Sequence, residues 1–214
     1  MYTPKAFEES QSEVLHHFIR AHPFGIFVTN SETGPKADHL PVLLDTSGQT
    51  AVLNLHVARA NAVWKTPPDV QEVLVIFHGP HAYVSPSWYP SKTEHGKVVP
   101  TWNYAVVHAY GTARIIDDAA WTRRHLAMMV QTHEAGRENP WKLTDAPADY
   151  IEQMLHGVVG VEITVTRLVG KLKLSQNRSL ADREGVILGL TKESESNAHA
   201  IAELMGATLR PEGT

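Results

Sequence analysis

The sequence has no cysteine, so disulfide frameworks, thiolate metal sites and cysteine nucleophiles are excluded. It also has no long apolar run. A membrane-spanning helix needs roughly 20 apolar residues, and the longest runs here, such as residues 73–77, are far shorter. The first nine residues lack the apolar block of a secretory signal. We therefore expect a cytoplasmic chain that does not enter the membrane.

An excess of positive charge is missing as well. The chain has 19 Lys and Arg against 23 Asp and Glu, a net charge of −4, and no basic run. Proteins that bind DNA directly usually carry a basic patch and a recognisable motif such as a helix-turn-helix. Direct DNA binding is possible, but neither charge nor motif supports it. The glycine patterns of Rossmann and P-loop nucleotide sites and the G-x-S-x-G nucleophile elbow are also missing.

What remains is typical of a globular, mainly β domain. Hydrophobic residues make up 43% of the chain and charged residues 20%. A helical pattern before Pro23 is followed, up to about residue 117, by short β-branched and aromatic segments separated by turn residues. This spacing predicts a closed antiparallel sheet. Later segments predict a helix capped by Asp118, a helix over 148–156, a strand over 158–168 and two short helices over 183–190 and 197–205. We expect a single domain over 1–214, a barrel with an N-terminal helix and C-terminal helical decoration.

Thirteen histidines suggest a metal site, but their spacing does not favour one. His78 and His81 flank Gly79 and Pro80, which predict a turn rather than a shared chelating face. We expect no bound metal. The catalytic residues, if there are any, stay unknown at this stage.

The densest group of unusual residues lies in 83–92 and 99–104. It contains two tryptophans, three tyrosines, three serines and Lys92. Aromatic faces can stack on a planar ring, hydroxyl and amide groups can hydrogen-bond to it, and a cation can meet a phosphate. For any single residue, barrel core or a surface turn is the simpler explanation. The clustering favours a wall for a phosphorylated planar ligand.

Two further segments carry suitable donors. Residues 56–61 lie where a strand leads into a short helix, so Arg59 and nearby amides could hold a phosphate. Residues 171–177 end a strand with a series of polar side chains. Taken alone, each segment is explained better as an ordinary strand end with solvated polar residues.

Four motifs carry a family resemblance: H-V-A-R-A-N from residue 56, Y-V-S-P-S-W-Y from 83, V-P-T-W-N-Y-A-V-V-H-A-Y-G from 99 and K-L-S-Q-N-R-S-L-A-D-R from 173. They resemble the PaiB family of FMN-binding negative transcriptional regulators. The resemblance implies an antiparallel split β-barrel like that of pyridoxamine phosphate oxidases, and a homodimer with FMN at its interface. It also implies that residues 56–61 hold the phosphate and that residues 101–104 serve the partner's site. The implied cofactor-binding residues are His56, Arg59, Asn61, Ser85, Ser87, Lys92, Trp102, Asn103, Lys173, Gln176 and Asn177.

Three functions remain open from the sequence. The first is an FMN-binding negative transcriptional regulator, whose effect on transcription could be indirect. The second is a flavin-dependent oxidoreductase that acts on a small molecule, with the cofactor supplying the redox chemistry. The third is haem binding on the same barrel, with a histidine as axial ligand.

Overall fold

A computed structural model describes residues 1–31, 33–65 and 72–209 of the chain. Their contacts divide into two compact units. Unit 1 comprises Met1–Phe18, His78–His108 and Val169–Thr214, and unit 2 comprises Ile19–Phe77 and Ala109–Leu168. Three long strands belong in part to each unit: β6 (Glu72–Val84), β7 (Thr101–Ile116) and β8 (Val158–Lys173).

The sheet contains the antiparallel pairs β1–β8, β2–β3, β2–β6, β4–β5 and β5–β8. Its hydrogen-bonded order is β3-β2-β6-β7-β8-β5-β4, and β1 pairs with β8. The remaining strands are β1 (Glu8–Glu9), β2 (Phe24–Ser31), β3 (Gly34–Pro41), β4 (Leu43–Asp45) and β5 (Val52–Ala58). In unit 2, β5 runs beside β8 with His56 opposite Gly160. Alternate residues of β5 and β8, among them Leu53, Leu55 and Val161, are fully buried and form the core.

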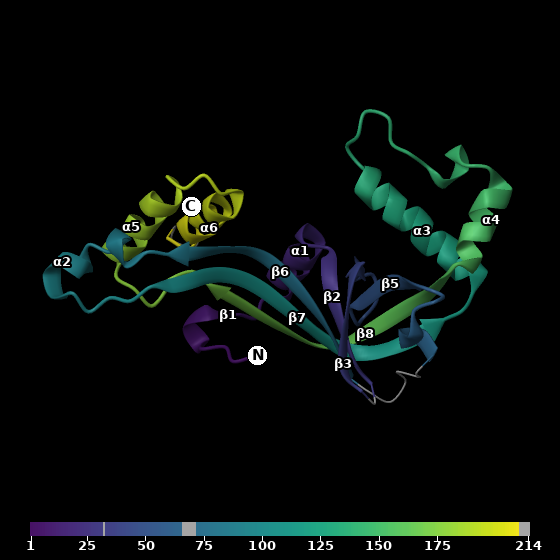
Figure 1. Cartoon of the computed structure of the whole chain (residues 1–214), viewed down its shortest axis with the longest axis horizontal. Coiled ribbons are helices and arrows are strands. Elements are labelled where there is room, and N and C mark those ends of the chain that lie inside the picture. Colours follow the sequence, from purple (N-terminus) through teal and green to yellow (C-terminus); the bar gives the residue numbers. More distant parts are fainter. Residues whose placement is uncertain (32, 66–71, 210–214) are drawn as a thin grey trace. The chain divides into compact units, whose positions relative to one another are not determined.

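The helices of unit 2 are α3 (Ala119–Glu134) and α4 (Ala148–His156), which contact each other (Figure 1). The unit also contains the short helices η2 (Ala62–Lys65) and η4 (Leu143–Asp145). Asp118 caps α3 by accepting a 2.6 Å hydrogen bond from the Trp121 backbone N–H, as its position in the sequence predicts.

Unit 1 has a helical layer on one face of its strands. Helices α5 (Leu180–Leu190) and α6 (Ser196–Ala207) lie side by side in Figure 1 and share a buried cluster with β6 and the end of β8. Trp88 lies against this layer, and a Cβ added at Gly189 of α5 would be 2.3 Å from its indole ring. The unit also contains η1 (Lys5–Phe7), η3 (Pro86–Trp88) and α2 (Ser91–His95), and α1 (Ser12–Ala21) begins in it.

The turn expected at Gly79 and Pro80 is wrong, because β6 continues through both residues. Both residues are buried, whereas the side chains of a regular strand point alternately to the two faces, so that only one of two neighbours is buried. The alternation of buried and exposed residues along β6 therefore shifts by one position here. His78 and His81 are both exposed, with ring centroids 4.9 Å apart. They therefore share a face, contrary to the expectation.

The fold class expected from the sequence, a mainly β antiparallel split barrel with flanking helices, is confirmed. The helix over Ala148–His156 agrees residue for residue, whereas β8 extends five residues beyond the expected end at Leu168. None of the described helices is both long and apolar enough to cross a membrane. The single domain over 1–214 stays a prediction, and its last residues, 210–214, lie outside the described range.

Candidate functional site

The residues predicted to bind the cofactor fall into two groups, one in each unit. His56, Arg59 and Asn61 lie in unit 2, and the other eight lie in unit 1. We describe each group within its own unit.

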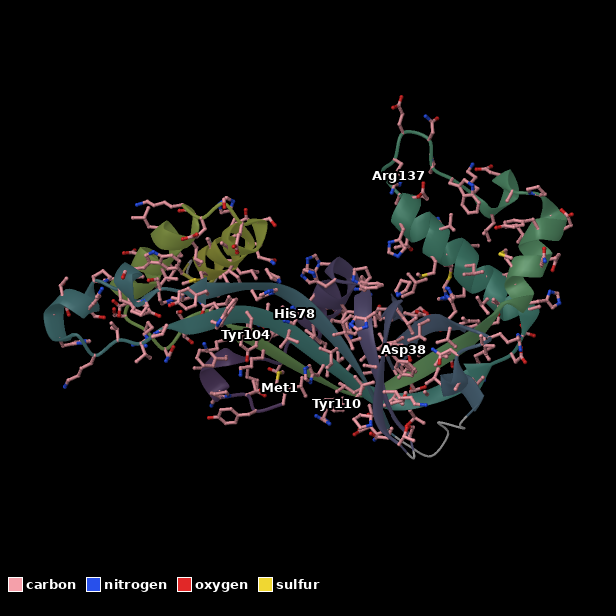
Figure 2. The ribbon with its side chains drawn as sticks, in the orientation of Figure 1. Met1, Asp38, His78, Tyr104, Tyr110 and Arg137 are labelled. Carbon is pink, nitrogen blue, oxygen red and sulfur yellow. The ribbon has the colours of Figure 1, made fainter. Side chains whose placement is uncertain are left out.

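In unit 1, the sheet face opposite the helical layer carries exposed aromatic rings. Tyr83 of β6 is 48% exposed and Trp102 of β7 is 52% exposed, although both belong to strands whose other face is core. The Trp102 ring centroid is 6.0 Å from that of Tyr83 and 6.1 Å from that of His81. Figure 2 labels two further residues of these strands, His78 and Tyr104. We call the group of His81, Tyr83 and Trp102 the aromatic face. It offers the flat apolar surface that a planar ligand needs.

A cation lies at the edge of the aromatic face. The Lys173 ammonium donates to Thr101 Oγ1 at 2.6 Å and to the Trp102 carbonyl oxygen. Partial burial lowers the pKa of Lys173, and the charges of Lys171 and Arg178 lower it further. Trp102 and Lys173, predicted separately, are thus brought together.

Asn103 and Gln176 have internal partners instead. Asn103 is fully buried, and its amide exchanges hydrogen bonds with Ser175 Oγ at 3.0 and 3.2 Å. Ser175 has a φ of 62°, in the left-handed region that a non-glycine residue rarely adopts. The Gln176 side chain accepts from the Leu174 N–H and donates to the Leu172 carbonyl. In unit 1 these two amides hold the end of β8 in shape.

The remaining unit 1 candidates lie on two surface segments, residues 85–92 after β6 and the turn that follows β8. Ser85 caps η3 by accepting from the Ser87 N–H at 3.2 Å, and the Lys92 ammonium donates to Ser87 Oγ at 3.2 Å. Asn177 is exposed. This arrangement leaves Lys92 and Asn177 accessible to a ligand.

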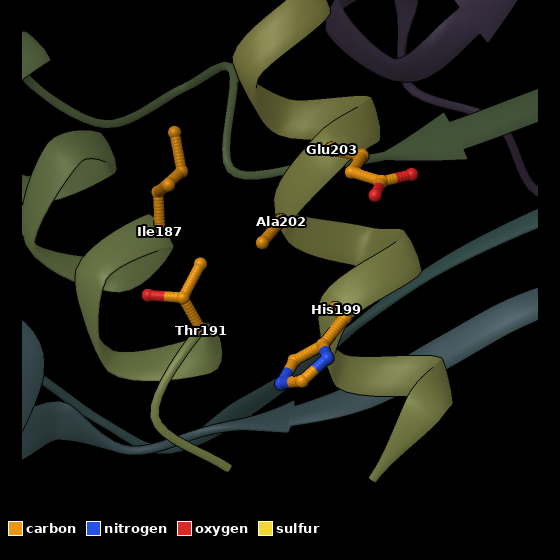
Figure 3. A pocket seen from close by; sticks show the side chains of 5 residues that line it. All are labelled: Ile187, Thr191, His199, Ala202 and Glu203. Atoms are coloured by element: carbon orange, nitrogen blue, oxygen red, sulfur yellow. The ribbon is translucent and has the colours of Figure 1, made fainter. Parts of the chain in front are cut away.

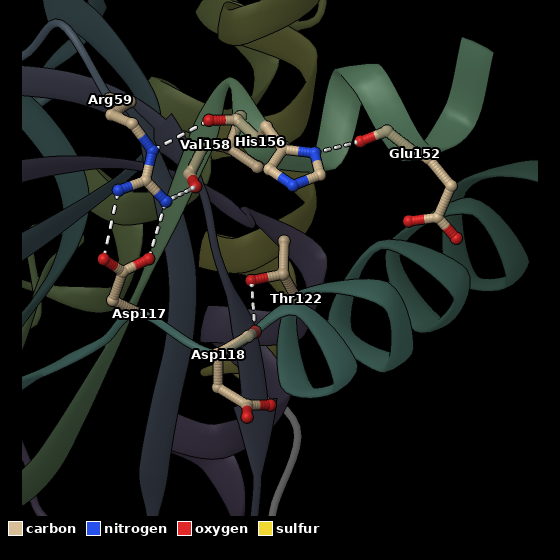
Figure 4. A network of polar contacts seen from close by, with 7 residues as sticks. All are labelled: Arg59, Asp117, Asp118, Thr122, Glu152, His156 and Val158. Atoms are coloured by element: carbon tan, nitrogen blue, oxygen red, sulfur yellow. Dashed lines mark hydrogen bonds and ion pairs between the residues drawn. The ribbon is translucent and has the colours of Figure 1, made fainter. Parts of the chain in front are cut away.

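In unit 2, Arg59 is fully engaged by protein groups (Figure 4). Its guanidinium forms a two-pronged ion pair with Asp117, at 2.6 and 3.1 Å, and donates to the carbonyls of His156 and Val158 at 2.8 and 3.3 Å. This contact lowers the pKa of Asp117, mainly through the hydrogen bond from Arg59. A phosphate bound by Arg59 would have to compete with a carboxylate already in place.

His56 and Asn61 also have protein partners. His56 Nδ1 lies 3.1 Å from Nε2 of His125, which is 2% exposed and stacked on Trp121 with a centroid distance of 5.0 Å. Burial lowers the pKa of both histidines, that of His125 to about 4. The Asn61 amide donates to Asp38 at 2.9 Å. His56 therefore packs beneath α3.

A separate cavity of about 330 Å³ lies between α5 and α6 (Figure 3). Ile187, Thr191, His199, Ala202 and Glu203 line it, and His199 Nε2 is hydrogen-bonded to the Glu193 carbonyl. No residue predicted to bind a ligand lies there. Across the part of the chain that is described, no three His, Asp or Glu side chains are grouped so as to hold a metal.

Sequence reasoning missed several partners that decide how the candidates behave. Asp117 neutralises Arg59, and His125 contacts His56. Neither partner carries a local signal, since each is more than 50 residues from the candidate that it contacts. Lys171 could have been found, because it is two residues from Lys173 and strand residues two apart share a face.

Comparisons with known proteins agree with the resemblance. Residues 1–167 match the family described as "Putative FMN-binding domain". The chain is 36% identical to the Protease synthase and sporulation protein PAI 2 of Bacillus subtilis, over 98% of this chain and 99% of that protein.

Two solved structures share the fold at low sequence identity. The flavocytochrome Anf3 from Azotobacter vinelandii is 13% identical, with a TM-score of 0.56 over 78% of this chain and 69% of that one. An FAD and heme binding protein from Mycobacterium smegmatis is 14% identical, with a TM-score of 0.57 over 78% and 73%. The expected cofactor, FMN, is confirmed by the family match, and the chain belongs to the PaiB-type family of FMN-binding proteins.

Proposed function

We propose that this protein is a PaiB-type negative transcriptional regulator that binds FMN at the interface of a homodimer. The observation that carries the proposal is the aromatic face of unit 1, with Trp102 exposed beside the Lys173 ammonium. Trp102 of β7 lies between two rings of β6, those of His81 and Tyr83. Exposing this apolar surface to water costs free energy, and the surface is suited to covering a planar ring. The similarity to a relative named for protease synthesis and sporulation supports a role in control rather than metabolism.

We propose a different role for each of these residues in binding the cofactor. Trp102 and Tyr83 supply stacking surface, Lys173 supplies positive charge, and Asn103 and Gln176 keep the strand end that carries Lys173 in place. When bound, FMN supplies the electron-transfer chemistry. We further propose that the aromatic face of one chain covers the flavin held by its partner.

A flavin-dependent oxidoreductase is the second candidate. The observation in its favour is the exposure of Tyr83 and Trp102, because a flavin ring stacked on an exposed face stays open to a small substrate. The cytoplasmic location expected from the sequence stays a prediction.

The test is titration of the purified protein with FMN, followed by absorbance and by quenching of flavin fluorescence. We expect stoichiometric binding, one FMN per chain, and weaker binding by about 10-fold or more in Trp102→Ala. Binding to DNA from its own promoter region that changes with flavin occupancy would support the regulator, whereas bleaching by reduced nicotinamide nucleotide would support the enzyme. A Soret band together with failure to bind FMN would contradict both.

A further inference from the structure

Three cations lie close together where β8 ends in unit 1. Lys171 and Lys173 alternate along β8 and so project from the same face. Arg178 follows the turn after the strand and lies against Tyr89, which is buried in the cluster shared with α5 and α6, and its charge contributes to lowering the pKa of Lys173. Lys171 is only 8% exposed.

The groups that contact these cations are neutral, and the buried Asp182 carboxylate, which like Arg178 interacts with Tyr89, accepts hydrogen bonds from Ser91 instead. Lys171 donates to the Tyr2 carbonyl at 3.1 Å and lies 5.2 Å from the Tyr104 ring centroid. Lys173 donates to a hydroxyl and a carbonyl, and the Arg178 guanidinium lies 5.0 Å from the Tyr89 ring centroid. Within the described ranges, no carboxylate forms an ion pair with any of the three. Glu8 is opposite Lys171 in the strand register, but the two side chains do not form an ion pair.

This pattern is unusual for a folded chain. Lysine is almost never fully buried unless it is paired, because removing an ammonium from water costs free energy that an opposite charge must offset. Here a buried lysine has two further cations nearby, and their repulsion adds to the cost. An anion of two negative charges at this end of β8 would offset the repulsion among them. Arg59 in unit 2, by contrast, already has its carboxylate in Asp117.

We propose that Lys171, Lys173 and Arg178 form an anion site that binds the phosphate group of a planar ligand. Trp102 and Tyr104 of β7 supply the neighbouring aromatic surface. A phosphate monoester offers three oxygens and close to two negative charges, which match three separate donors. The inference rests on the proposed function only for the identity of the ligand. The phosphate belongs either to the flavin or to a second small molecule. The experiment below distinguishes these two sources.

The experiment compares FMN with riboflavin, which has the same ring system and no phosphate, in a phosphate-free buffer. Lys173→Gln and Arg178→Gln should each weaken FMN binding by about 10- to 100-fold and leave riboflavin binding nearly unchanged. Lys173→Arg should retain most of the affinity because it keeps the charge. Lys192→Gln, an exposed lysine of the same unit, is the matched control. Arg59→Gln tests the competing position and should change the ratio of FMN to riboflavin affinity little.

Inorganic phosphate and pyrophosphate provide a readout that does not need flavin. Both should raise the thermal midpoint of the flavin-free protein and lose this effect in Lys173→Gln. If they do so while the two flavins bind alike, the site serves a second phosphorylated molecule. If neither anion binds, and the ratio of flavin affinities falls in Arg59→Gln instead, the inference is overturned. Failure of both flavins to bind, with phosphate binding intact, would overturn the proposed function alone.

Discussion

At the scale of single residues, the His56 and His125 pair should make the protein sensitive to acid. Burial lowers the pKa of both side chains, that of His125 from 6.5 to about 4. In the unfolded chain a histidine takes up a proton near pH 6.5, whereas in the folded protein the two histidines take up protons only at lower pH. The stabilisation is therefore complete above pH 6.5 and is lost as the pH falls toward 4. For His125 the loss amounts to about 3 kcal/mol.

The measurement is the free energy of unfolding by urea at a series of pH values between 7 and 4. In His125→Gln the fall over this range should be smaller, although stability at pH 7 drops because a buried contact is lost. His133→Gln, which replaces an exposed histidine of the same helix, should keep the full pH dependence. Equal slopes in His125→Gln and the unmodified protein would rule out this explanation.

At the scale of elements, two helical glycines of unit 1 should respond in opposite directions to alanine. A Cβ at Gly189 of α5 would lie 2.3 Å from the Trp88 ring, so Gly189→Ala should destabilise unit 1 by about 1–3 kcal/mol through overpacking. A Cβ at Gly206 of α6 would meet nothing within 4 Å. Because alanine favours the helix, Gly206→Ala should stabilise by up to about 1 kcal/mol.

Thermal and urea unfolding of the two variants checks this pair of expectations. The double variant Gly189→Ala/Trp88→Leu should recover part of the loss, since the smaller side chain gives the new methyl room. A neutral Gly189→Ala would mean that Trp88 is not held against α5.

The sequence predicts elements well where the signal is local. Pro147 and Gly157 bracket α4, and Asp118 caps α3, so their positions are readable. It fails at Gly170, where the strand continues: a Cβ there would lie 2.3 Å from Leu15 and 2.8 Å from the Glu9 carbonyl, so the glycine serves close packing rather than a turn. The site shows the same limit. Residue type indicated that Asn103 and Arg59 could bind a ligand, but only tertiary contacts reveal their partners, Ser175 and Asp117.

At the scale of the whole molecule, flavin binding and dimerisation should be linked. If the aromatic face of one chain covers the flavin of its partner, each FMN bound stabilises the dimer, and dilution weakens both together. We expect the apparent Kd for FMN to rise as the protein is diluted below its dimer dissociation constant. Sedimentation velocity with and without FMN, beside fluorescence titrations at several protein concentrations, measures the two equilibria.

Trp102→Ala provides the decisive comparison for this linkage. It should weaken FMN binding and shift the molecule toward the monomer, because the same side chain serves both equilibria. Trp141→Ala is the matched control, since Trp141 is similarly exposed at 43% but belongs to unit 2 and to none of the proposed contacts. A Trp102→Ala protein that loses FMN affinity while its dimer constant and its dilution response stay unchanged would place the tryptophan over its own chain's flavin. The interface would then have to be sought on another surface.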